Sequence, residues 1–288
     1  SLNYNGAYTV VASDAFFISQ SIEAVNFSES NWGTVNAIPA TLSFWAYAGT
    51  AGTYGGSVRN GPASGNSGRS YPFSFTLPAS TFVYVTIHVL GDTAGIWTLT
   101  GNAGAVNISF SVGAGSTYSA AAGAWIAGNY ISVPGAVSVV GTSGAALTIT
   151  GVQFEFNPVA TPFERRSIGE ELAACQRYYE KSYLQGSAAG TATTQAMTNV
   201  YFTGVSSAAN SINIPIVYKA TKRVVPTLTI YSPATSTAGK AHDYSGNAAD
   251  VTATIQFPGD GSFVCNAPMA AATPTINIGF HWTADAEL

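Results

Sequence analysis

Residues 83–89 read Val-Tyr-Val-Thr-Ile-His-Val, in which every second side chain is aliphatic. Strict alternation over seven residues predicts a β-strand with one face on a core, because successive side chains of a strand point to opposite faces. The stretch Leu42-Ser43-Phe44-Trp45-Ala46-Tyr47 alternates in the same way. If Phe44 faces the core, Trp45 and Tyr47 point outward from the same sheet.

The same pattern recurs along the first 158 residues, interrupted by Gly, Ser, Asn and Pro at intervals of roughly 10 to 15 residues. A shift of phase at Gly151 indicates a β-bulge or a tight turn. Many short strands separated by turn signals predict an antiparallel β-sandwich. Beyond the two stretches quoted, strands are expected at Tyr8–Val11, Phe73–Leu77, Trp97–Leu99, Val106–Val112, Val137–Val140 and Leu147–Phe156.

Residues 164–181 differ in composition, since they hold eight of the 24 charged residues of the chain. Ser167 followed by Glu170 has the spacing of a capping box, and the apolar residues that follow recur at helical spacing. We therefore expect one amphipathic α-helix from about Ile168 to Tyr183, ending near Gly186, that connects two sandwiches.

Alternating segments resume after the helix, at 196–202, 212–216, 228–230, 251–257 and 276–282. They are enough for a second, smaller sandwich. The sequence thus predicts an all-β chain in three parts: a β-sandwich over 1–163, a connector helix over 164–186 and a C-terminal β-sandwich over 187–288.

Composition excludes several classes of protein. Only 8% of the 288 residues are charged, the net charge is −4, and there is no basic tract, which argues against nucleic-acid binding. No apolar run approaches the ~18 residues of a membrane-spanning helix. Cys175 and Cys265 are too few for a disulfide framework; they could form one bridge, but two buried thiols are expected.

Three stretches carry a resemblance to a known family: Val152–Phe156, then Ala160-Thr-Pro-Phe-Glu-Arg-Arg-Ser167, and Glu170-Glu-Leu-Ala-Ala-Cys-Gln-Arg-Tyr-Tyr179. Together they resemble the strand–helix junction of bacteriophage tail and fibre proteins, in which a jelly roll of carbohydrate-binding type ends in this way. The resemblance implies an N-terminal jelly roll, a place on the surface of the virion, other virion proteins as partners, and a homotrimeric fibre. Phe154 and Phe156 depart from the aliphatic residues usual there.

Catalytic chemistry is not indicated. Hydrolysis of a glycosidic bond needs two carboxylates about 5 to 10 Å apart, and the five acidic residues before residue 164 contain no closely spaced pair. His242 with Asp243 imitates a base and its orienting carboxylate, but a solvated pair is expected. No zinc-ligand spacing is present, and no cofactor is expected. A structural calcium ion, held partly by backbone carbonyls, stays open without named ligands.

A glycan site needs flat aromatic rings beside hydrogen-bonding side chains, because sugars present C–H faces and hydroxyl rims. The first domain supplies residues of both kinds. The alternative for the aromatic residues is packing against a subunit or the helix, and for the arginines it is clasping the Gly/Ser/Asn-rich loop between them. The candidate glycan-binding residues are Trp45, Tyr47, Tyr54, Arg59, Arg69 and Trp97.

These observations favour a non-catalytic virion surface protein that binds host or surface glycans. The alternative is a purely structural fibre, decoration or adaptor protein, with the aromatic residues in trimer contacts. The third hypothesis is a polysaccharide depolymerase or an accessory module of a secreted bacterial enzyme.

Overall fold

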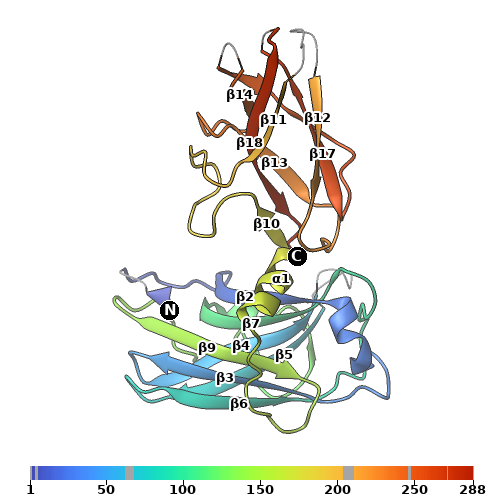
Figure 1. The fold of residues 1–288 in the computed structure, drawn as a ribbon. Helices are drawn as coiled ribbons and strands as arrows, with labels where there is room; N and C mark the ends of the chain where they lie inside the picture. Colours follow the sequence, from blue (N-terminus) through green and yellow to red (C-terminus); the bar gives the residue numbers. More distant parts are fainter. Residues whose placement is uncertain are drawn as a thin grey trace. The chain divides into compact units, whose positions relative to one another are not determined.

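The computed structural model describes residues 2–3, 6–61, 68–203, 211–245, 248–270 and 272–287. The chain divides into two compact units, Ser1–Arg165 and Arg166–Glu287. Both are built mainly from β-strands (Figure 1), so the all-β prediction is confirmed. No described helix is long and apolar enough to span a membrane.

The first unit is a sandwich of two antiparallel sheets, with strand orders β1-β9-β3-β6 and β2-β7-β4-β5-β8 (Figure 1). Without the two-residue β8, these orders interleave as the two Greek keys of a jelly roll do. Two short 3₁₀ helices, Ala24–Ser30 and Ser116–Tyr118, interrupt the connections. The strands are β1 (Leu2–Asn3), β2 (Ala15–Glu23), β3 (Ala40–Ala48), β4 (Gly52–Asn60), β5 (Arg69–Leu77), β6 (Val83–Val89), β7 (Gly104–Ala114), β8 (Ile126–Ala127) and β9 (Ala146–Glu155).

The core of this unit lies between the inner faces of the two sheets. Phe44 on β3 is fully buried, and its ring lies 5.1 Å from that of Phe75 and 5.0 Å from that of Phe110 in the opposite sheet. Burying an aromatic or aliphatic side chain of this size stabilises a fold by about 1.5–3 kcal/mol. The alternation around Phe44 is therefore what fixes the orientation of β3, and it leaves Trp45 46% exposed as predicted.

The bulge predicted at Gly151 is confirmed. The register of β3 and β9 shifts between Ser43 and Trp45, opposite Gly151. Gly151 has φ +59°, a left-handed conformation in which a side chain would be strained.

Three predicted strands are wrong, because residues 8–11, 97–99 and 137–140 are irregular. Residues 137–140 run beside strands without forming a ladder: the amides of Val137 and Val140 donate to the carbonyls of Thr53 and Val112 at 2.8 and 3.0 Å. Conversely, β2 and β4 were not predicted. In β4 the glycines at 55 and 56 hide the alternation of apolar and polar side chains. Gly56 is needed there because a Cβ on it would lie 2.3 Å from the Phe73 ring.

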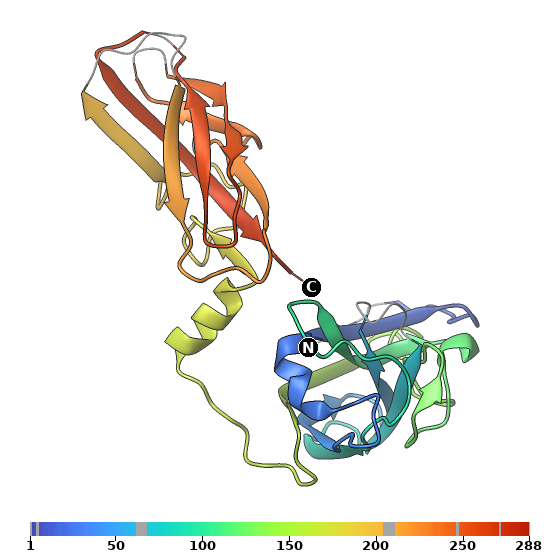
Figure 2. The same ribbon diagram turned by 90° about the vertical axis from the view of Figure 1, so that its right-hand side faces the viewer.

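The second unit is a smaller sandwich. The long strand β18 pairs with β10, β11, β13 and β14, and a separate sheet has the order β12-β17-β16. In Figure 2, β18 (red) runs along most of the unit. The strands are β10 (Tyr179–Lys181), β11 (Thr198–Thr203), β12 (Ser211–Val217), β13 (Thr227–Tyr231), β14 (Lys240–Asp243), β15 (Ala249–Thr252), β16 (Thr254–Gln256), β17 (Ser262–Pro268) and β18 (Thr275–Asp285).

The helix α1 (Ile168–Gln176) begins as predicted and ends early. Its capping box is present: the Ser167 hydroxyl accepts from the Glu170 amide, and the Glu170 carboxylate accepts from the Ser167 amide. The helix stops at Gln176 because residues 179–181 pair with β18 instead. None of its residues is buried, so the expected helix to Tyr183 with a covered apolar face is wrong.

The two cysteines differ in burial, and a buried ion pair lies in the second unit. Cys265 is buried, but Cys175 on α1 is exposed, so the prediction of two buried thiols holds for only one of them. Lys222 and Glu180 form the ion pair, with Nζ 2.6 Å from Oε2. Their side chains are 0% and 2% exposed.

Candidate functional site

Four aromatic side chains lie on the outer face of the four-stranded sheet of the first unit. Trp45 and Tyr47 come from β3, Tyr84 from β6, and Phe82 immediately precedes β6. Trp45 lies 5.3 Å from Tyr84, and Tyr47 lies 5.1 Å from Phe82, measured between ring centroids. Phe82 is 51% exposed and Tyr84 42%. We call these four residues the aromatic strip.

Strand register explains the strip. Trp45 is directly opposite Tyr84 in the antiparallel pair β3–β6, where Cβ atoms approach to about 5 Å. Phe163 extends the strip beyond β9, since a Cβ on Gly151 would lie 3.7 Å from Trp45 Cδ1 and 3.9 Å from Phe163 Cδ2. Tyr84 and Phe82 were not among the predicted glycan-binding residues, although the alternation over residues 83–89 places Tyr84 on the outward-facing side of the strand.

The segment after β9 folds back onto the outward side chains at the end of β9. Thr161 donates its amide to Glu155 Oε1 at 2.8 Å, and the Glu164 amide donates to Gln153 Oε1 at 2.9 Å. Burial raises the pKa of Glu155, but hydrogen bonds from Thr161 and Gln153 outweigh it and hold the pKa below its ordinary value. Ser43 is buried, whereas the strip stays open, as do Thr86 and His88 farther along β6.

The strip combines exposed ring faces with polar groups at its edge. The hydroxyls of Tyr47 and Tyr84 make no hydrogen bond with the described residues and are free to donate or accept. Exposed, paired rings with hydroxyls beside them match the C–H faces and hydroxyl rims of a saccharide. Of the six residues predicted to bind glycan, the structure brings only Trp45 and Tyr47 together here.

Arg69 and Trp97 are joined elsewhere, through Asp92. Arg69 Nε donates to Asp92 Oδ2 at 2.8 Å, with a second bond from Nη2 to Oδ1, and Trp97 Nε1 donates to Oδ2 at 3.2 Å. Asp92 is 1% exposed. Both side chains form a structural clasp with Asp92, so they do not join Trp45 and Tyr47 in one platform.

Tyr54 and Arg59 also lie apart from the aromatic strip. Tyr54 is 1% exposed and donates its hydroxyl to the Thr50 carbonyl at 2.7 Å, so it belongs to the core. Arg59 is 6% exposed and lies on β4 of the opposite sheet. Linear proximity in the sequence grouped these residues, but the two sheets of the sandwich separate them.

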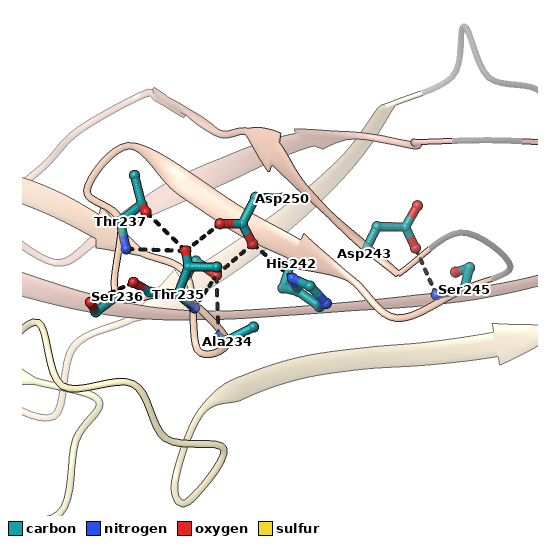
Figure 3. Close-up of polar contacts among 9 residues, drawn as sticks. Ala234, Thr235, Ser236, Thr237, His242, Asp243, Ser245 and Asp250 are labelled. Carbon is teal, nitrogen blue, oxygen red and sulfur yellow. Dashed lines mark hydrogen bonds and ion pairs between the residues drawn. The ribbon is translucent and has the colours of Figure 1, made fainter.

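The second unit holds a polar cluster around Asp250 (Figure 3). His242 Nδ1 lies 2.7 Å from Asp250 Oδ1, and Ser232 donates its hydroxyl to the same oxygen at 2.6 Å. The Thr235 hydroxyl donates to Asp250 Oδ2. Burial raises the pKa of Asp250, but the hydrogen bonds from Ser232, Thr235 and His242 outweigh it, so the pKa lies below the ordinary value.

The expectation that His242 and Asp243 form a solvated pair is wrong, since the His242 side chain is only 11% exposed. Asp243 is buried and accepts the amide of Ser245 at 2.8 Å (Figure 3) and the amide of Ala270 at 2.9 Å. The histidine instead meets Asp250, its cross-strand partner in β15. The arrangement is no nucleophile–base–acid triad, because both hydroxyls donate to the aspartate and neither donates to histidine Nε2.

Among the described residues, no three His, Cys, Asp or Glu side chains lie close enough to hold a metal ion. A calcium site built from backbone carbonyls stays a matter for experiment.

Comparison with known proteins finds only distant structures. No known protein family matches the chain, and no curated protein does. Wild-type discoidin II from Dictyostelium discoideum is 10% identical with a TM-score of 0.25, covering 96% of this chain and 79% of that one. The PBSX exported protein XepA is 10% identical with a TM-score of 0.20, covering 97% and 84%. Likenesses this slight identify neither a family nor a ligand, so any functional conclusion must rest on the geometry of the chain itself.

Proposed function

We propose that the chain is a non-catalytic surface module that binds glycans with the aromatic strip of its first unit. The observation that carries the proposal is the open strip itself: Trp45, Tyr47, Phe82 and Tyr84 lie in two ring pairs on a sheet face. Clustered exposed apolar rings are rare on a surface without a binding role. The low charge of the chain, 8% of residues, suits a neutral partner.

The place of the module on a bacteriophage virion, and its assembly as a homotrimer with other virion proteins, are parts of the same proposal. Their support is the resemblance of residues 152–179 to the strand–helix junction of phage tail and fibre proteins. The capping box at Ser167 and the helix start at Ile168 agree with that junction.

A glycan array with the full chain tests the proposal, followed by calorimetric titration of the best ligand. Trp45→Ala and Tyr84→Ala are expected to weaken binding about tenfold each, since a sugar ring stacked on an aromatic side chain gains on the order of 1–2 kcal/mol. Tyr201→Ala is the matched control, because Tyr201 is 64% exposed but lies in the second unit. Absence of any glycan ligand, or equal losses for all three variants, would refute the proposal.

Light scattering on the same variants distinguishes the structural alternative. If the strip is a contact between subunits, the wild-type chain forms an oligomer that Trp45→Ala dissociates. If the strip binds glycan, the oligomeric state of the variant equals that of the wild type. Release of reducing ends from a bound polysaccharide would contradict the non-catalytic part of the proposal.

A further inference from the structure

Arg59 is a buried arginine on the outer face of the five-stranded sheet. It lies on β4 and is 6% exposed. Its Nη2 donates to Ser109 Oγ at 3.0 Å, its Nη1 donates to Asn129 Oδ1, and its Cζ lies 5.4 Å from the centroid of the Phe17 ring. Each of these partners is uncharged.

The guanidinium of Arg59 therefore lacks a counter-charge among the described residues. It has five N–H donors, of which these contacts use two, and Nε is buried with no acceptor. Burial of the guanidinium lowers the pKa of Arg59, and no neighbouring charge opposes that effect among the described residues. Withdrawing a guanidinium from water costs several kcal/mol unless an anion or hydrogen bonds compensate. By contrast, Arg69 on the neighbouring strand has Asp92.

A second buried donor without a partner lies beside it. Ser57 precedes Arg59 by two residues on β4, so the two side chains share a face. The Ser57 hydroxyl is buried and has no hydrogen-bond partner in the part of the chain that the structure describes. Ser57 is directly opposite Ser109, whose hydroxyl accepts from the guanidinium. Directly opposite Cβ atoms lie about 5 Å apart, so Ser57 lies beside the serine that contacts the guanidinium of Arg59.

The register also connects these buried groups to the edge of the sheet. Ser19 on β2 is opposite Ser109, and Ser109 is opposite Ser57, so three hydroxyls form a row across three strands. β2 is an edge strand, and Ser19 is exposed. Phe17, which covers the guanidinium, is 39% exposed and adjoins the β-bulge between Phe16 and Phe17.

We propose that Arg59, with Ser57 and Ser109, forms an oxyanion site that takes the carboxylate of an acidic saccharide. The guanidinium supplies the charge and a planar set of donors, and the row of serines supplies partners for sugar hydroxyls. Phe17 moves aside to admit the ligand. This site lies on the sheet opposite the aromatic strip, and it does not depend on the strip binding glycan.

The arginine side chain offers its own probe, because the Arg59 Nε–H gives a resonance in ¹⁵N NMR spectra that Arg59→Lys would identify by its absence. Glucuronate is the ligand, glucose is its neutral counterpart, and sulfate tests a free anion, all at constant ionic strength. We expect glucuronate to shift the Arg59 Nε–H and glucose to leave it unchanged. A sulfate effect equal to that of glucuronate would support the oxyanion site and assign it to a free anion.

Two substitutions test the residues. Arg59→Gln is expected to weaken glucuronate binding at least about tenfold, and Ser57→Ala about fivefold. Ser57→Ala should not destabilise the fold, since its hydroxyl has no partner to lose among the described residues. If Arg59→Gln fails to fold, the glucuronate affinity of Ser57→Ala alone tests the proposed site. Arg165→Gln is the control, because it removes the same charge from an exposed position. No shift with either anion, or affinities unchanged in Ser57→Ala and Arg59→Gln, would overturn the proposal.

Discussion

Lys222→Met should destabilise the second unit far more than an ordinary lysine substitution. The Lys222 ammonium donates to Glu180 Oε2 at 2.6 Å and to the Ala220 carbonyl at 3.2 Å, and lies 4.8 Å from the Tyr218 ring centroid. The substitution removes the cation and leaves the Glu180 carboxylate buried. Among the described residues, that carboxylate then keeps as hydrogen-bond donor only the Lys219 amide, at 3.1 Å.

The magnitude can be worked from this geometry. Removing one partner of a buried ion pair costs about 3–5 kcal/mol, because an uncompensated charge stays in the interior. Both side chains are almost fully buried, so solvent screening does not reduce the effect. Replacing both groups, in Glu180→Gln with Lys222→Met, removes the stranded charge and should restore most of the loss. Lys240→Met, which deletes only a surface bond to Thr252, should cost no more than about 0.5 kcal/mol.

Hydrogen exchange measured by mass spectrometry across a urea series suits this test, because peptides from β18 report on the second unit alone. The expected order of stability is wild type and Lys240→Met, then the double variant, then Lys222→Met. A loss below about 1 kcal/mol for Lys222→Met, or a double variant as unstable as the single one, would refute the reasoning.

Three further outcomes are expected. His281 Nδ1 lies 2.9 Å from Ser182 Oγ, and burial lowers the pKa of His281. Below about pH 6.5 the histidine therefore binds a proton more readily in the unfolded chain than in the folded one. The second unit should then lose stability as the pH falls, by at most ~1.4 kcal/mol per pH unit. An NMR titration that gives His281 a pKa above about 6.5 would contradict this. Iodoacetamide should label native Cys175 and leave Cys265 unmodified, because burial raises the pKa of Cys265 to about 12; two labels on the folded chain would count against it. Gly151→Ala should cost about 1–2 kcal/mol in thermal unfolding of the first unit, since φ is +59° there, and a neutral effect would show that the bulge relaxes.

Side-chain alternation was enough to predict the part of the site that depends on one strand. Because Phe44 must be buried, Trp45 and Tyr47 had to face outward, and they do. The pairing of β3 with β6 could not be read from the sequence, since register depends on contacts between distant residues. Tyr84 was therefore missed although its phase is the right one.

The errors have a common physical cause, which is that neighbours in sequence were taken as neighbours in space. Adjacent residues of a strand point to opposite faces, so His242 meets Asp250 across the ladder and Asp243 faces away. Likewise, nothing in the local pattern shows that Asp92 neutralises Arg69 while Arg59 is left without an acid. Partners for buried charges are set by the assembled sheets.

The four-fold pairing of β18 has a consequence for synthesis on the ribosome. Among the described ladders, β10, β11 and β13 pair with β18 alone, and β10 precedes it by about a hundred positions. At 5–20 residues per second, the nascent chain holds β10 without its partner for roughly 5–20 s, and β11 and β13, which lie nearer to β18 in sequence, for shorter times. Their exposed edges would attract other polypeptides during that interval, so yield on expression should depend on protection by chaperones.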